Sequence, residues 1–189
     1  MFYEIDNFPF LKSIRDNVDV IAAEFRSKMN DPLLKDFLSA EVSELTSHTH
    51  YWVKEGGFDE SQIGYDARDG SWASFPLYKK GFPIKTFDVR EVFPKTTELI
   101  LTVPEVNFAS FFKLAPNAGT KEHAHSISNL IFHLCLFDIE GTSVLRCDGH
   151  EKIFSQKGDY ALFDYSKPHS SFNSGKKDRI NLIIDFSKG

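Results

Sequence analysis

Cysteine is scarce in this sequence, and long apolar runs are missing. The two cysteines, Cys135 and Cys147, are too few for a disulfide framework and indicate a reducing compartment. No apolar stretch reaches the length of a transmembrane helix. The first ten residues, MFYEIDNFPF, lack the basic region and the apolar core of a signal peptide. We therefore expect a cytoplasmic protein that does not associate with membranes.

Positive charge is also in short supply. Lysine and arginine total 22 against 27 acidic residues, and the basic residues form no patch of the kind that binds nucleic acid. Gly-rich phosphate loops, Cys-x-x-Cys motifs and an ordered Ser-His-Asp set are missing as well. These absences argue against nucleic acid and leave a small molecule or a peptide as the expected partner. They give no indication of the oligomeric state.

Phenylalanine, by contrast, is abundant, with 19 residues in a chain of 189. This length fits a single domain, residues 1–189, with a helical part over about residues 1–100 and a β core over about 106–189. Apolar residues recur at helical spacing after Pro9, namely Phe10, Ile14, Val18, Ile21 and Phe25. We expect a second helix after Pro32, a loop over residues 54–70, and a short helix after Pro94 with Thr96 as its cap.

The second half of the chain has the pattern of short strands. Seven apolar segments are separated by turns such as Pro-Asn-Ala-Gly and Asp-Gly-His: FASFFKLA, NLIFHLCLF, SVLRCD, EKIFS, DYALFD, HSSFN and RINLIIDF. No helical pattern intervenes, so the sheets are expected to be antiparallel. The sequence therefore predicts a mainly β fold that closes as a barrel or jelly roll, with flanking N-terminal helices.

Two of these segments have faces of different character. Since side chains alternate across a strand, residues 129–137 have one wholly apolar face and a second face that carries His133. Residues 179–186 likewise have an apolar face and a second face that carries Arg179. We expect the apolar faces to lie under the N-terminal helices. The mixed faces would then line the barrel interior and bring His133 and Arg179 together near its mouth.

Histidines are concentrated in the β half, where five of the seven lie: His123, His125, His133, His150 and His169. Neutral imidazole is the commonest ligand for transition metals. His125 precedes one predicted strand and His169 opens another, and strand ends converge at the mouth of a barrel. The two can therefore meet as metal ligands. The alternative is that His125 is a solvated loop residue and His169 a turn residue.

Arg179 opens an apolar strand and needs a partner there. Arginine is almost never fully buried unless it is paired, and its planar fork suits a carboxylate. An anionic ligand would satisfy it. An internal ion pair with Asp164 or Asp185 is the alternative.

Several segments together resemble the aspartyl/asparaginyl β-hydroxylase family of iron(II)/2-oxoglutarate dioxygenases. They are FPFLKSIRDNVDVIAAEF, WASFPLYKKG, FPKTTELILTVP, FFKLAPNAGTKEHAHSISN and FDYSKPHSSFNSGKKDRINLIIDF. The last resembles the family's Phe-Asp-x-Ser-x-x-His…Arg motif. The resemblance implies a double-stranded β-helix, that is, a cupin-like jelly roll.

The resemblance also implies roles for individual residues. His125 and His169 would bind iron(II), with His123 as the fallback for the first ligand. Arg179 would bind the distal carboxylate of the cosubstrate 2-oxoglutarate, and His133 would contact the same molecule. The implied activity is hydroxylation of an aspartyl, asparaginyl or other amino-acid-like substrate with O2. A cupin-like metal-binding protein or isomerase without oxygenase activity is the alternative.

Ile127, two residues after His125, cannot ligate iron; members of the family often lack an acid there, so the resemblance implies water at the third position. Three features depart from the family pattern. Ile131 stands where the family commonly has arginine, Phe112 stands where it commonly has serine, and the interval of eight residues from His125 to His133 is shorter than usual. These departures concern the substrate side of the site, and they favour a substrate other than a charged aspartyl side chain.

Overall fold

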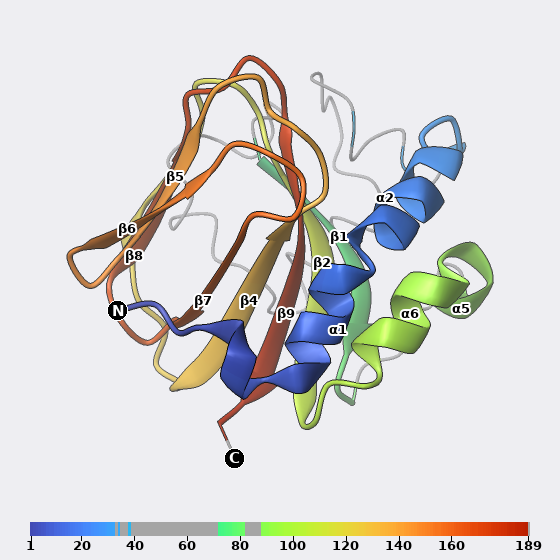
Figure 1. Cartoon of the computed structure of the whole chain (residues 1–189), viewed down its shortest axis with the longest axis horizontal. Helices are drawn as coiled ribbons and strands as arrows, with labels where there is room; N and C mark the ends of the chain where they lie inside the picture. Colours follow the sequence, from blue (N-terminus) through green and yellow to red (C-terminus); the bar gives the residue numbers. More distant parts are fainter. Residues whose placement is uncertain (33, 35–37, 39–71, 82–87, 189) are drawn as a thin grey trace.

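The computed structural model describes residues 1–32, 34, 38, 72–81 and 88–188. In this part of the chain, strands form two antiparallel sheets, of order β1-β2-β9-β4-β7 and β3-β8-β5-β6. Helices cover one side of the five-stranded sheet, and the four-stranded sheet lies on its other side (Figure 1). The expected mainly β jelly roll with flanking N-terminal helices is confirmed.

The strands agree with the sequence pattern except at two places. The five-stranded sheet contains β1 (Trp72–Lys79), β2 (Val106–Leu114), β4 (Asn129–Cys135), β7 (Tyr160–Asp164) and β9 (Arg179–Ser187). The four-stranded sheet contains β3 (Gly119–His123), β5 (Ser143–Cys147), β6 (His150–Phe154) and β8 (His169–Asn173). All seven predicted strands are present.

The strands β1 and β3 were not predicted, and both lie at the edge of their sheet. The segment of β1 contains Pro76, which an edge strand tolerates next to the register shift between Pro76 and Tyr78. The segment of β3 is polar and lacks the alternation that marks a half-buried strand.

The helices follow the sequence pattern closely. They are the 3₁₀ turn Ile5–Asn7, α1 (Pro9–Asp16), α2 (Val18–Ser27), α5 (Val89–Val92) and α6 (Pro94–Ile100). The predicted N-terminal helical stretch is therefore present but is interrupted at Asn17. The helix expected after Pro32 and the loop expected over residues 54–70 fall largely or wholly outside the described residues. Within the described part, no helix is long and apolar enough to cross a membrane.

The predicted capping role of Thr96 is wrong. Helix α6 begins at Pro94, so Thr96 lies inside its first turn and is fully buried. The N-terminal N–H groups are instead capped by Glu24 of α2. Its carboxylate accepts hydrogen bonds from the backbone N–H of Lys95 at 2.9 Å and of Thr96 at 2.8 Å, and from Thr96 Oγ1 at 2.6 Å. A side chain from another helix can cap α6 only once the two helices pack, which a local pattern does not report.

Glu24→Ala is expected to lower the free energy of unfolding by about 1–2 kcal/mol, because it leaves several helix-terminal donors without an acceptor. Urea denaturation monitored by circular dichroism measures this change. Glu98→Ala in the same helix is the control. Glu98 forms only an exposed ion pair with Lys95, so its loss should cost about 0.5 kcal/mol or less. Equal effects of the two substitutions would contradict the capping role.

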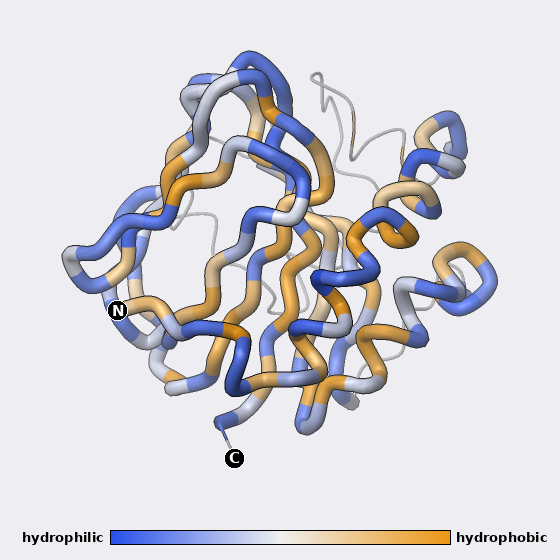
Figure 2. The backbone as a smooth tube through the Cα atoms, in the orientation of Figure 1, coloured by the Kyte–Doolittle hydropathy of each residue, from blue (hydrophilic) through white to orange (hydrophobic). Residues whose placement is uncertain are grey.

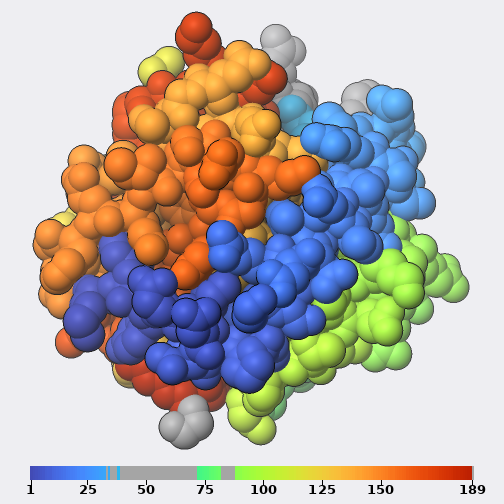
Figure 3. All heavy atoms as spheres, viewed as in Figure 1, coloured from blue at the N-terminus to red at the C-terminus, as the bar shows by residue number. Residues whose placement is uncertain are grey.

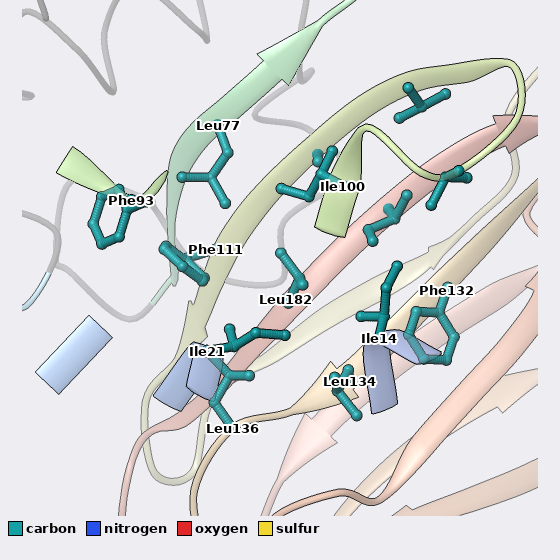
Figure 4. Close-up of a cluster of buried hydrophobic side chains, with 14 of the residues drawn as sticks. Ile14, Ile21, Leu77, Phe93, Ile100, Phe111, Phe132, Leu134, Leu136 and Leu182 are labelled. Carbon is teal, nitrogen blue, oxygen red and sulfur yellow. The ribbon is translucent and has the colours of Figure 1, made fainter. Parts of the chain in front are cut away.

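The main core lies between the helices and the five-stranded sheet. The apolar faces of β4 and β9 pack here, as the sequence predicts, against Ile14 and Ile21 of the N-terminal helices (Figure 4). Phe111 is at the centre of an aromatic group, with ring centroids 4.9 Å from Phe25 and 5.3 Å from Phe93. Apolar residues accordingly follow these strands, whereas the hairpin loops are hydrophilic (Figure 2).

The N-terminal residues pack against β7, so that the first segment of the chain covers part of the barrel (Figure 3). Phe2 forms an isolated bridge with Phe163, and the backbone N–H of Tyr3 donates to the carbonyl of Leu162 at 2.8 Å. The faces of β4, β7 and β9 that point away from the helices line the interior between the two sheets.

Candidate active site

Three histidines meet at the end of the four-stranded sheet. Candidate ligand atoms of His123, His125 and His169 all lie within 4.8 Å of one another. His123 ends β3 and pairs in register with His169, which opens β8. His125 follows β3, and its backbone N–H donates to the carbonyl of Tyr165 at 3.1 Å. The three imidazoles together offer a metal three nitrogen ligands.

A close approach of two backbones makes this pairing possible. A Cβ at Gly119 would meet the carbonyl oxygen of Ser171 at 2.7 Å, so only glycine allows β3 to lie this near β8. The register then shifts between Thr120 and His123. This irregularity places His123 directly opposite His169.

The protonation of these rings suits metal binding. The Nδ1 atoms of His123 and His169 lie 2.7 Å and 2.8 Å from the carbonyl oxygens of Lys121 and Lys167. A carbonyl only accepts, so each Nδ1 carries the proton and each Nε2 lone pair is available to a metal. His150 makes the same contact at the exposed start of β6, so this contact alone does not define a ligand.

Burial favours the uncharged forms of His125 and His169. Burial, partly opposed by the hydrogen bond to Lys167, lowers the pKa of His169 to about 4. Burial and the neighbouring His123 also lower the pKa of His125. Since the neutral imidazole is the form that binds a metal, these two side chains do not have to lose a proton first.

Arg179 is buried, and no carboxylate pairs with it in the part of the chain that the structure describes. Its side chain is 6% exposed, and its Nη1 donates to Ser143 Oγ at 2.9 Å and to Ser171 Oγ at 2.6 Å. Burial lowers its pKa to about 10, so the guanidinium still carries its charge at neutral pH. A buried cation held by two neutral hydroxyls has donors to spare for an anion.

The internal ion pair considered for Arg179 is therefore wrong for the described residues. Asp164 accepts from Lys188 at 2.5 Å, and Asp185 accepts from Asn107, Asn129 and Tyr165. Both carboxylates lie at the opposite end of the interior from Arg179, because β9 runs from Arg179 to Ser187 and Asp185 pairs with Ile131.

One cavity connects the histidines to Arg179. It is lined by Trp72, Phe112, Lys113, Leu114, Thr120, His123, His125, Ile131, His133, Leu145, Phe163, His169, Ser170, Ser171 and Arg179. The prediction that His133 and Arg179 lie inside the barrel together is confirmed. Burial, with Arg179 and His169 nearby, lowers the pKa of His133 well below its usual value. The cavity thus combines uncharged imidazoles, a fixed cation and apolar walls.

Tyr165 supports the histidine cluster from the side. Its ring packs edge-on against His125, with centroids 4.7 Å apart, and its hydroxyl donates to Asp185 at 3.1 Å. Burial, followed by the nearby carboxylate of Asp185, raises the pKa of the Tyr165 phenol, which therefore stays protonated. The ring restrains the orientation of His125, whose imidazole, unlike those of His123 and His169, makes no hydrogen bond within the described part of the chain.

A family model described as aspartyl/asparaginyl β-hydroxylase matches residues 16–188. The chain belongs to this family. The match covers α2, α5, α6 and both sheets, and therefore nearly the whole chain. None of the curated proteins compared with the chain matches it.

Several of the solved structures similar to this family member are described as cupin proteins. A predicted oxalate decarboxylase from Thermotoga maritima has a TM-score of 0.42 and 15% identity, over 62% of this chain and 81% of that one. A cupin 2 conserved barrel domain protein from Salinispora arenicola has a TM-score of 0.40 and 15% identity, over 69% and 85%. We base no functional argument on likeness at these scores.

The structure gathers every predicted site residue of this family member into one cavity: His123, His125, His133, His169 and Arg179. His123 was an alternative to His125, whereas the structure places both beside His169. Their spacing of two residues could have indicated this, since such residues share a face of an extended chain. Ile127 is 62% exposed and takes no part.

Sequence reasoning missed the groups that come from other strands. Ser143 of β5 and Ser171 of β8 hold Arg179, and Trp72 of β1 forms part of the cavity wall. Ser171 lies two residues after His169 and so shares its face of β8, which is a signal that was present in the sequence. Ser143 had no such signal.

Proposed function

We propose that this protein is an iron(II)- and 2-oxoglutarate-dependent dioxygenase that hydroxylates an amino-acid-like substrate. The observation that carries the proposal is the pairing, within one cavity, of a three-histidine cluster with a buried arginine whose hydrogen bonds, among the described residues, go to two hydroxyls. Family membership supports a hydroxylase.

The residues present suit iron by ligand type. Three neutral imidazoles would hold the ion on one side and leave its other positions to small molecules. When bound, iron(II) supplies, with 2-oxoglutarate and O2, the oxidising power for hydroxylation. The histidines fix its place, and Tyr165 restrains His125.

The rest of the cavity would position the organic molecules. Arg179 binds the distal carboxylate of 2-oxoglutarate by charge-assisted hydrogen bonds and thereby orients its other end toward the histidines. The apolar side chains of Phe112, Ile131 and Phe163 exclude water from the reacting groups. Since Ile131 replaces the family's arginine, the substrate group near it is expected to be uncharged or less acidic than an aspartyl carboxylate.

A turnover assay tests this function. Purified protein is incubated with iron(II), ascorbate, 2-oxoglutarate and a panel of amino acids and peptides, and succinate and products that have gained one oxygen are measured by mass spectrometry. We expect iron-dependent succinate formation that one class of substrate stimulates. The control reaction contains zinc(II) in place of iron and should give no succinate. A protein that binds metal but neither binds nor consumes 2-oxoglutarate would instead be a cupin-like metal-binding protein or isomerase.

A further inference from the structure

Asn181 is a buried amide with no partner, at the edge of the proposed cosubstrate site. The residue is 1% exposed, and neither its Nδ2 nor its Oδ1 has a hydrogen-bond partner among the described residues. Nearly all buried polar groups in native proteins are hydrogen-bonded, and each one that is not costs stability. A strand position flanked by Ile180 and Leu182 would accept an apolar residue at no such cost.

The position of Asn181 indicates which molecule would complete these bonds. Strand alternation puts Asn181 on the same face of β9 as Arg179, while Ile180 and Leu182 point into the helix-covered core. Its register partner on β2 is Phe112, and His133 of β4 is its diagonal neighbour through the pairing of Cys135 with Asn181. Arg179, Phe112 and His133 all line the cavity. Asn181 therefore lies on the cavity side of the sheet, next to residues that line the cavity.

A second unpaired atom supports the same conclusion. His133 Nδ1 is also buried without a partner, and His133 is close enough to Arg179 for the guanidinium to help lower the pKa of the ring. Arg179 itself uses only Nη1 in the hydrogen bonds found within the described part of the chain. Unused hydrogen-bonding groups of three neighbouring residues thus converge on this end of the interior.

We propose that Asn181 is a specificity-determining residue for the anion that Arg179 binds. In this assignment Nδ2 donates to a carboxylate oxygen of 2-oxoglutarate, and Oδ1 accepts from a free N–H of Arg179 or from a water that enters with the ligand. The ligand class is a dicarboxylate with one end at the guanidinium and the other toward the histidines. The inference rests on the proposed function, because 2-oxoglutarate is the cosubstrate of that reaction.

Asn181→Leu tests the inference, because it replaces the amide with an apolar group of similar size. The free protein should become more stable, with a melting temperature about 2–4 °C higher, since a buried unpaired amide is removed. The affinity for 2-oxoglutarate should fall by about 10-fold to 100-fold, the value of a hydrogen bond to a charged group. Calorimetric titration with zinc(II) in place of iron measures the affinity without turnover. The affinity for zinc(II) alone should be unchanged.

The matched control is Ile183→Val, at the next position on the same face of β9. It should leave 2-oxoglutarate affinity unchanged. Should leucine not fit, Asn181→Val provides the same comparison with a smaller side chain. An Asn181 variant that is less stable and binds 2-oxoglutarate as tightly as the unchanged protein would show a structural role and overturn the inference. If the unchanged protein does not bind 2-oxoglutarate at all, the proposed function itself fails.

Discussion

Replacing Arg179 with alanine is expected to weaken 2-oxoglutarate binding by about 30-fold or more and to leave metal binding nearly unchanged. Truncating one partner of a buried, hydrogen-bonded charge pair costs about 2 kcal/mol or more, which gives this factor. The reason lies in the surroundings of the side chain: the guanidinium is buried over the ring of Phe154, and its hydrogen bonds within the described part of the chain go to the hydroxyls of Ser143 and Ser171. Calorimetric titration of the zinc(II)-loaded protein with 2-oxoglutarate measures the affinity.

Two further variants show whether a loss of 2-oxoglutarate affinity comes from the Arg179 guanidinium itself or from the removal of any arginine. Arg146→Ala removes an exposed arginine that pairs with Glu151, and it should leave the affinity for 2-oxoglutarate unchanged. Arg179→Lys keeps the charge but loses the planar fork, so its affinity should lie between those of the unchanged protein and the alanine variant. If Arg179→Ala folds and binds 2-oxoglutarate normally, Arg179 is structural and the cosubstrate assignment is wrong.

His169→Ala is expected to reduce metal affinity by more than about 100-fold. Loss of a group that merely orients a ligand already costs about 10-fold to 100-fold, and loss of the ligand itself should cost more. Burial holds the pKa of His169 at about 4, so its imidazole is the metal-binding form at neutral pH. Competition with a chromophoric chelator for zinc(II) measures the affinity.

Zinc(II) affinities of variants at two other histidines show whether the loss is specific to the proposed metal ligands. His150→Ala is the control, because His150 makes the same Nδ1 contact with a backbone carbonyl but lies exposed at the start of β6. It should bind metal as the unchanged protein does. His123→Ala should weaken binding, because its ring centroid lies 4.3 Å from that of His169. Normal metal affinity in His123→Ala would instead support a site of two histidines, His125 and His169.

Much of the fold could be predicted because its signals are local. The alternation of apolar and mixed residues in 129–137 and 179–186 correctly assigned one face to the helix-covered core and the other to the interior. Alternation has a period of two residues, so a short segment already displays it. The edge strands β1 and β3 were missed because Pro76 and the polar sequence GTKEH hide that period.

The sequence by itself therefore determined which side chains face the interior, His133 and Arg179 among them. It also contains, in the family's order, the motifs that place the chain in its family. Tertiary structure alone decided which of these residues meet. Only the approach of β3 to β8 at Gly119, with its register shift, sets His123 beside His169. Only the apposition of the two sheets gives Arg179 two hydroxyl partners and no carboxylate, and leaves the amide of Asn181 unpaired. The physical reason is that contacts between distant strands depend on register and sheet packing, which no local pattern contains.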